Sequence, residues 1–400
     1  MAAKLHEIAR TPRSPHEIYV IWFKVKALGL LGFFKNYPDL CRLCSLLRTG
    51  NSYPMSELEL FKHQISSPKK VVITTHHKPD ADALGSCLGM SNFLVKLGHE
   101  ATVVTPSDYP SFLHWMKGNE DVLNFEDPKH KQAAIQRVQE AEVIICLDFS
   151  CPKRMHGLLP FVEKSEAFKV NIDHHQDPKD FADFRYWSTA AAATCELVYE
   201  LIVNIGCKQL IDKDIADCLY AGIMTDTGGF RHPNTTKNVH LITAELIDIG
   251  ADNTTISRLI YDTNSINRLK FIGFAITRRL VILEDLKTAY FQISKKDLRK
   301  FDSQTGDTEG LVNYALSLDG IQIAALFTER EDGIKISFRS TDNVVVNKFA
   351  AEYFDGGGHK NASGGKSYLS LPETTEKFEK LIKQNYNSLF NQPELVHEKN

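Results

Sequence analysis

The feature that most constrains this chain is an alternation of short apolar runs with amphipathic stretches between residues 56 and 224. Four stretches of five residues each are predicted as strands, a length typical of buried strands; they are Val71–Thr75, Ala101–Thr105, Val143–Leu147 and Phe168–Ile172. The other stretches have helical spacing or composition; they are 56–66, 83–97, about 130–140, 190–205 and 211–224. Strands that alternate with helices predict an α/β fold built on a parallel sheet with both faces covered.

Polar residues follow three of these predicted strands at the point where each strand ends. His76 comes directly after the first run, Asp148 ends the third, and Asp173, His174 and His175 follow the fourth. Ligands bind at the carboxyl ends of strands in sheets of this kind. We therefore expect these side chains to meet at one edge of the sheet.

The chemistry of these residues points to metal ions. Residues 76–82 hold two histidines and two carboxylates, and Asp226 lies within a stretch flanked by glycines, 222–229. Asp80 and Asp82 are equally compatible with capping the helix that follows. Taken together, four aspartates and two histidines could hold two metal ions that share one bridging carboxylate; they are His76, Asp80, Asp82, Asp148, His174 and Asp226.

A second, smaller α/β domain is predicted after residue 285. Residues 254–282 look helical and would link the two domains. The remaining pattern predicts strands at Thr288–Ile293, Ile321–Thr328 and Gly333–Arg339, helices at 308–318, 344–353 and 371–388, and a glycine-rich turn at Gly356–His359. The expected boundaries are an extension at 1–54 with no part in the chemistry, a catalytic domain at 55–252, a linker at 253–284 and a substrate-binding domain at 285–392, with the active site in the cleft between domains.

Composition narrows the classes of function. The net charge is only -3, so the chain lacks the basic excess of proteins that coat long nucleic acids. The eight cysteines are scattered, and the lone Cys41–Cys44 pair is weak support for zinc. We expect a reducing, cytoplasmic location. The apolar segment 18–34 contains Lys24 and Lys26 and is a poor membrane span, so no stable membrane association is expected.

The motifs resemble those of a known family. The sequences H-K-P-D-A-D-A-L-G-S, L-D-F-S, N-I-D-H-H and G-I-M-T-D-T-G-G-F resemble the four motifs of the DHH phosphoesterases. The sequence G-G-G-H-K-N-A-S-G-G resembles the signature of the DHH-associated C-terminal domain. The resemblance covers about residues 56–390, and the compact two-domain form is most similar to the nanoRNase/pAp phosphatase group, the NrnA type.

The resemblance implies a role for each matching residue. His76 and Asp80 would hold one metal ion, Asp82, His174 and Asp226 would hold the other, and Asp148 would bridge them. His175 would face the scissile phosphate, as a ligand to its oxygen or as an acid for the leaving group, and Asp173 would support the histidines. The residues expected to grip the nucleotide or its phosphate are Arg339, Gly356, Gly357, Gly358 and His359.

The expected activity is that of a two-metal phosphoesterase. Mn²⁺ is the expected ion, with Mg²⁺ or Co²⁺ as alternatives. The expected substrates are short single-stranded RNA or DNA oligonucleotides and phosphorylated nucleotides such as 3′-phosphoadenosine 5′-phosphate (pAp). Hydrolysis of cyclic di-AMP or pApA is an alternative, and a nucleotide-binding regulator with an inactive site is another. A homodimer is compatible with the sequence.

Overall fold

The computed structural model describes residues 57–341 and 344–390. The predicted extension at 1–54, with Cys41, Cys44 and the apolar segment 18–34, lies outside the described residues, so these predictions stay untested. The first described element is the helix α4 (Glu57–Gln64), which matches the helix expected at 56–66. Within the described ranges, no helix has both the length and the apolar character needed to cross a bilayer.

The first sheet has six strands in the order β3-β2-β1-β4-β5-β6, and all neighbours are parallel. The strands are β1 (Lys70–Thr74), β2 (Glu100–Thr105), β3 (Leu123–Asn124), β4 (Val143–Leu147), β5 (Phe168–Asp173) and β6 (Phe184–Trp187). In the centre, Ile73 of β1 pairs with Val103 on one side and Ile145 on the other. Strands buried on both faces have continuous apolar sequences, which explains why the central strands were predictable. The predicted parallel sheet is confirmed.

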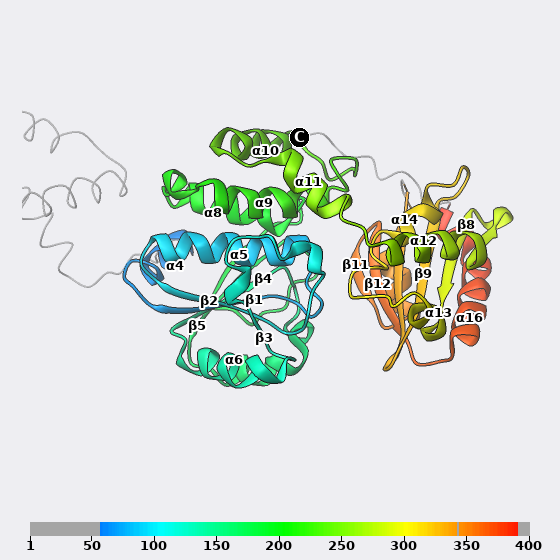
Figure 1. The fold of residues 1–400 in the computed structure, drawn as a ribbon, viewed down its shortest axis with the longest axis horizontal. Helices are drawn as coiled ribbons and strands as arrows, with labels where there is room; N and C mark the ends of the chain where they lie inside the picture. Colours follow the sequence, from blue (N-terminus) through cyan, green and yellow to red (C-terminus); the bar gives the residue numbers. More distant parts are fainter. Residues whose placement is uncertain (1–56, 342–343, 391–400) are drawn as a thin grey trace, which may run out of the picture. The chain divides into compact units, whose positions relative to one another are not determined.

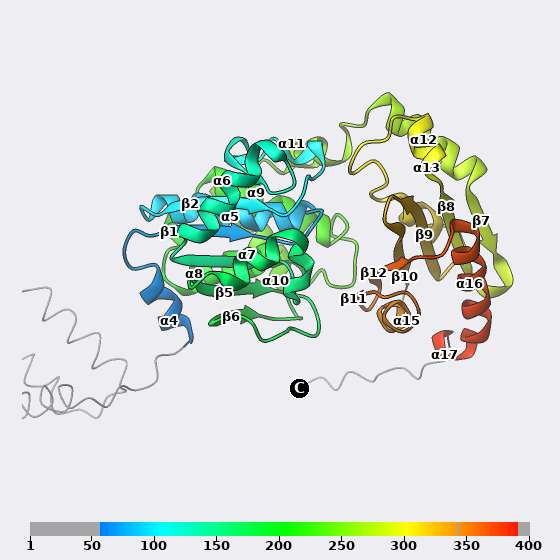
Figure 2. The same cartoon turned by 90° about the horizontal axis from the view of Figure 1, so that it is seen from below.

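Helices cover both faces of this sheet (Figure 1). One face carries α5 (Ala81–Lys96) and α8 (Thr194–Asn204), with α9 (Lys213–Asp226) and α10 (Lys237–Ile249) outside them. The other carries α6 (Pro128–Glu140), the 3-10 segment η4 (Pro152–Leu158) and α7 (Leu159–Lys164). Figure 2 shows α6 and α7 together on this face. Val72, Val104 and Ile144 from the strands pack with Ala134 and Val138 of α6 in one buried cluster.

The second sheet is mixed, with the order β11-β12-β10-β9-β8-β7 and only β8 and β9 parallel. The strands are β7 (Leu280–Leu283), β8 (Thr288–Ile293), β9 (Ile323–Arg330), β10 (Gly333–Ser340), β11 (Gly357–His359) and β12 (Ala362–Ser367). Side chains of α12 (Ile266–Arg278) and α14 (Leu311–Leu316) pack on one face. Those of α15 (Val346–Tyr353) and α16 (Leu371–Gln384) pack on the other. The remaining helices are α11 (Asn253–Tyr261), α13 (Lys295–Lys300) and α17 (Tyr386–Phe390).

Three predictions for this half were wrong in detail. The helical stretch predicted through residue 282 ends at Arg278. The apolar residues Leu280–Leu283 instead form the edge strand of the sheet and pair antiparallel with β8. The predicted turn at Gly356–His359 contains the strand β11, which pairs with β12. The terminal helix expected at 371–388 breaks at Asn385 into α16 and α17.

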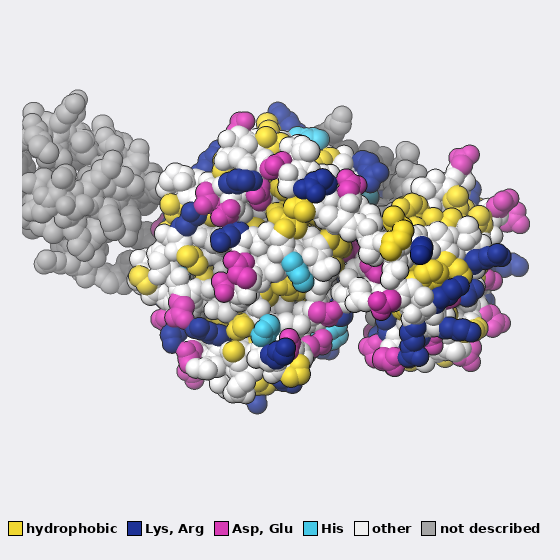
Figure 3. All heavy atoms as spheres, in the orientation of Figure 1, with side chains coloured by type: hydrophobic (Ala, Val, Ile, Leu, Met, Phe, Trp, Pro, Cys, Tyr) yellow, Lys and Arg dark blue, Asp and Glu magenta, His cyan; other side chains and the backbone are white. Residues whose placement is uncertain are grey.

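The charged side chains are mixed over the surface that Figure 3 shows. On that face, Lys and Arg lie among Asp and Glu over the first domain, and they gather over α12 and α13 of the second. This mixture agrees with the small net charge of the sequence. Any attraction for a phosphate must therefore come from a local group of residues.

Candidate metal centre

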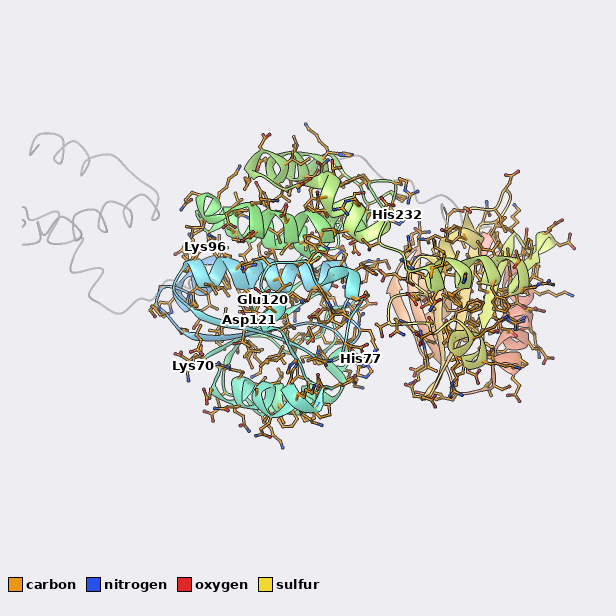
Figure 4. All side chains as sticks on the ribbon, in the orientation of Figure 1. Lys70, His77, Lys96, Glu120, Asp121 and His232 are labelled. Atoms are coloured by element: carbon orange, nitrogen blue, oxygen red, sulfur yellow. The ribbon has the colours of Figure 1, made fainter. Side chains whose placement is uncertain are left out.

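The six predicted metal ligands meet at the carboxyl edge of the parallel sheet. Figure 4 shows the two ends of β1, with Lys70 where the strand begins and His77 just beyond the other end. His76 follows β1, Asp148 follows β4, and Asp173 is the last residue of β5. The expected convergence of three strand ends is therefore present in the fold.

The first group of possible ligands is His76, Asp80 and Asp148, whose ligand atoms lie within 4.8 Å of one another. His76 Nε2 is 3.3 Å from Asp148 Oδ2 and 4.0 Å from Asp80 Oδ2. His76 Nδ1 donates to the carbonyl of His77 at 2.9 Å, because a carbonyl can only accept. This bond leaves the lone pair on Nε2, the atom that faces the carboxylates.

The second group is Asp82, His174 and Asp226. His174 Nδ1 donates to the carbonyl of Ala191 at 3.3 Å, so its Nε2 again faces the carboxylates. Nε2 is 3.3 Å from Asp226 Oδ2 and 3.9 Å from Asp82 Oδ2. Among the described residues, this buried nitrogen has no hydrogen-bond partner. A divalent cation would supply that partner, so the residues present fit a metal ion.

Asp148 lies between the two groups. Its Oδ2 faces His76, and its Oδ1 is 3.5 Å from His174 Nε2. The backbone of Asp148 has a left-handed φ of 66°, which is uncommon away from functional positions for a residue with a side chain. Thr194 Oγ1 donates to Asp148 Oδ1 at 2.9 Å and fixes the orientation of the carboxylate. One oxygen thus faces each ligand group.

Helix ends position the other carboxylates. Asp80 caps α5, since its Oδ1 accepts from the backbone N–H groups of Asp82 and Ala83, while its Oδ2 remains toward His76. The capping and ligand interpretations of Asp80 are therefore compatible. Asp82 accepts from the first N–H groups of α8, with Thr194 N at 2.7 Å and Cys195 N at 2.9 Å. Asp226 is the last residue of α9.

The aspartates crowd negative charge at a buried place. Burial and the neighbouring Asp148 raise the pKa of Asp82 to about 7, and burial with Asp82 raises the pKa of Asp226 well above its usual range. Burial opposes protonation of His174, but the carboxylates of Asp148, Asp226 and Asp82 outweigh it and raise its pKa to about 10. Both effects show that the cluster favours added positive charge, which a divalent ion provides.

His175 lies beside the two groups with its ring held from one side. Its Nδ1 is 2.8 Å from Asp173 Oδ1 and 3.6 Å from Asp148 Oδ1. Asp173 is fully buried, and its Oδ1 also accepts from the backbone N–H of His175 at 3.2 Å. On the other side of the ring, His175 Nε2 is 3.3 Å from Arg154 Nη1. Sequence reasoning missed Arg154, whose only signal is its place in the segment after β4.

His359 of the second sheet also reaches this place. Its ring centroid is 4.7 Å from those of His174 and His175. Arg339 is half-buried; burial lowers its pKa, and the Asp226 and Asp80 carboxylates offset part of that effect. Both residues lie within the electrostatic reach of the metal centre, although no direct bond between Arg339 and the centre is present among the described residues.

The three glycines before His359 differ in their surroundings. A Cβ at Gly356 would lie 2.1 Å from the carbonyl oxygen of Gly364, and one at Gly358 would lie 2.7 Å from that of Ala362. These two glycines are required by the close pairing of β11 and β12. A Cβ at Gly357 would meet no atom within 4 Å. The predicted phosphate-cradling role of all three stays a prediction.

Comparison with known proteins adds a family context. The DHH family N-terminal domain matches residues 70–223, and the DHHA1 domain matches residues 285–388. The bifunctional oligoribonuclease and PAP phosphatase NrnA of Bacillus subtilis is 30% identical over 310 residues, which cover 76% of this chain and 91% of that protein. Its namesake from Thermus thermophilus is 29% identical over 326 residues, which cover 78% and 89%. A crystal structure of an exopolyphosphatase-related protein from Bacteroides fragilis is 36% identical, covers 83% of this chain and 97% of that one, and has a TM-score of 0.78.

Proposed function

Because the chain belongs to the DHH family of metal-dependent phosphoesterases, as its motifs predicted, we propose that it hydrolyses short oligoribonucleotides to mononucleotides and pAp to AMP. The observation that carries the proposal is Asp148, whose two oxygens face two separate groups of metal-binding side chains. That arrangement suits two ions that share one carboxylate. Curated relatives named for oligoribonuclease and PAP phosphatase activity support the choice of substrate.

The two ligand groups would hold one divalent ion each. His76 and Asp80 would bind the first and Asp82, His174 and Asp226 the second, with Asp148 shared. Two such ions supply an activated water and neutralise the negative charge of the phosphate. Imidazole and carboxylate ligands together favour Mn²⁺, with Mg²⁺ and Co²⁺ as the alternatives.

The protein's own residues would orient the substrate. Asp173 accepts the Nδ1–H of His175 and keeps this ring against the metal centre. His359 approaches the same place from the second sheet, so a phosphate bound there would contact both halves of the described chain. Arg339, half-buried on the exposed side of β10, would add positive charge toward the nucleotide. Oligonucleotide length would be limited where the two domains meet, in the predicted interdomain cleft.

A substrate panel with Mn²⁺ tests this proposal. Product release would be measured from pAp, a ribodinucleotide, a long single-stranded RNA, pApA and cyclic di-AMP. We expect the highest kcat/KM for the dinucleotide and pAp, and no turnover by Asp148→Ala. Preferred hydrolysis of pApA or cyclic di-AMP would replace the proposed substrate with the alternative. Binding of these nucleotides without any turnover would instead support the inactive regulator.

A further inference from the structure

Arg154 lies in the segment that leaves the same strand as Asp148. It belongs to η4 (Pro152–Leu158), six residues beyond that aspartate. Its backbone is anchored, because its carbonyl accepts from the N–H of His77 at 2.8 Å and its own N–H donates to the carbonyl of Cys151 at 3.0 Å. The backbone of Arg154 is thereby joined to the loop that carries His76.

The side chain of Arg154 donates to His175. A guanidinium group has only donors, so His175 Nε2 must accept from Arg154 Nη1 across the 3.3 Å between them. The proton of the neutral ring then lies on Nδ1, where Asp173 Oδ1 accepts it at 2.8 Å. His175 therefore orients Arg154 in this structure through its Nε2.

Arg154 is a half-buried cation without a carboxylate partner among the described residues. Two other arginines of the same domain are paired with carboxylates, Arg137 with Glu100 and Arg185 with Asp180. A guanidinium has five N–H donors, and the hydrogen bond to His175 uses one of them. A phosphate oxygen is the anion whose geometry best matches the remaining donors.

The surroundings favour an anion over another metal ion at this place. His174, His175 and His359 come close enough to hold a metal. However, His174 Nε2 already faces the carboxylates of the metal centre, and the guanidinium of Arg154 would repel a cation. The carboxylates of Asp173 and Asp148 thus lie on the Nδ1 side of the His175 ring, and the guanidinium of Arg154 lies on its Nε2 side. A phosphate between the metal centre and Arg154 would be attracted by both the ions and the guanidinium.

We infer that Arg154 binds the scissile phosphate through its guanidinium group, and that His175 accepts from Arg154 to aim it. The inference deepens the proposed function and rests on it for the identity of the substrate, although phosphate binding itself can be judged without it. Neither the motifs nor the predicted ligand set included this residue. Arg154 would act by direct contact with a non-bridging oxygen of the phosphate.

The test compares Arg154→Ala and Arg154→Lys with the wild-type protein, all loaded with Mn²⁺. Lys153→Ala is the matched control, because it removes the same charge from the exposed neighbouring residue. Steady-state kinetics would be measured with pAp and with bis(p-nitrophenyl) phosphate, and the affinity for inorganic phosphate by calorimetry. Each measurement would be repeated with added guanidinium chloride below its denaturing range.

For Arg154→Ala we expect kcat/KM and phosphate affinity to fall by about 10- to 100-fold, the usual effect of losing a hydrogen bond to a charged group. Added guanidinium should restore part of the lost kcat/KM and phosphate affinity. The values for Arg154→Lys should lie between those of Arg154→Ala and wild type, and Lys153→Ala should behave as wild type. Wild-type values in Arg154→Ala, or losses that guanidinium does not reverse, would overturn the inference. If the wild-type protein hydrolyses bis(p-nitrophenyl) phosphate but not pAp, the proposed substrate is refuted and the inference about Arg154 is not. The affinity for inorganic phosphate tests the binding role of Arg154 even if the protein cleaves none of these substrates.

Discussion

Replacing Gly222 with alanine should disturb the metal centre through the packing of α9 against Asp82. Gly222 lies in α9 against α5 and the start of α8. A Cβ there would be 2.3 Å from Cys195 Sγ, 2.7 Å from Asp82 Oδ1 and 2.9 Å from Asp82 Cα. Two of these atoms end short, buried side chains, of which the Asp82 carboxylate is held by the backbone N–H groups of Thr194 and Cys195, and the third is backbone. Alanine must therefore push α9 away from α5 or displace the carboxylate of Asp82.

The magnitude follows from three contributions. Overpacking in a tight interior costs about 1–3 kcal/mol. Loss of one hydrogen bond to the Asp82 carboxylate, from Thr194 N or Cys195 N, costs about 1.5–3 kcal/mol. Alanine regains about 1 kcal/mol over glycine inside a helix. The net expectation is a loss of about 1.5–5 kcal/mol in the free energy of unfolding.

Thermal unfolding and metal titration measure both consequences. The midpoint of Gly222→Ala should fall by several degrees, and its Mn²⁺ affinity should fall as well because Asp82 is displaced. Gly273→Ala in α12 is the control, because a Cβ at that exposed position meets nothing within 4 Å. This control should be as stable as wild type or slightly more stable, with unchanged Mn²⁺ affinity. Wild-type stability and metal binding in Gly222→Ala would refute the packing argument.

Three further predictions concern the same site. Asp148→Ala should abolish turnover and lower the Mn²⁺ stoichiometry measured by metal analysis; appreciable residual activity would contradict the bridging role. Because the folded-state pKa of His174 is raised to about 10, its contribution to stability is present below about pH 6.5 and lost as pH rises toward 10. The melting temperature of the chelator-treated protein should therefore fall as pH rises over that interval, and Mn²⁺ should reverse the fall. A melting temperature that rises with pH would count against the charge cluster. Gly357→Ala should leave melting unchanged, whereas Gly356→Ala should lower it because its Cβ meets a carbonyl oxygen at 2.1 Å. Weaker binding of pAp by Gly357→Ala would support phosphate cradling, and unchanged binding would exclude it at this position.

The central part of the fold was predictable from local pattern. The buried strands β1 and β4 have nearly continuous apolar sequences, and polar residues follow or end β1, β4 and β5, so both the parallel sheet and its polar edge could be expected. The edge strand β3 has only two residues, too few to give a pattern. The strand β7 was predicted as helix, because four apolar residues after a helix do not show their period.

Some residues of the site could not be predicted from the sequence, and the reason differs from that for the strands. The six candidate ligands stand out by residue type and by position after strands. Thr194 and Arg154 contact the site only because α8 and η4 pack beside it, and nothing local in their sequence marks them. The glycines at 356 and 358 were interpreted as an anion-binding loop, although the pairing of β11 with β12 already requires them. Tertiary packing decides these positions.

The carbonyl bonds to Nδ1 of His76 and His174 have a consequence for how ions enter the protein. Both imidazoles already present Nε2 to the place of binding, and Asp82 is already held by the start of α8. Little rotation of side chains is then needed when an ion arrives. Loading should accordingly follow simple second-order kinetics with no slow conformational phase, and it should release the proton that His174 holds at neutral pH.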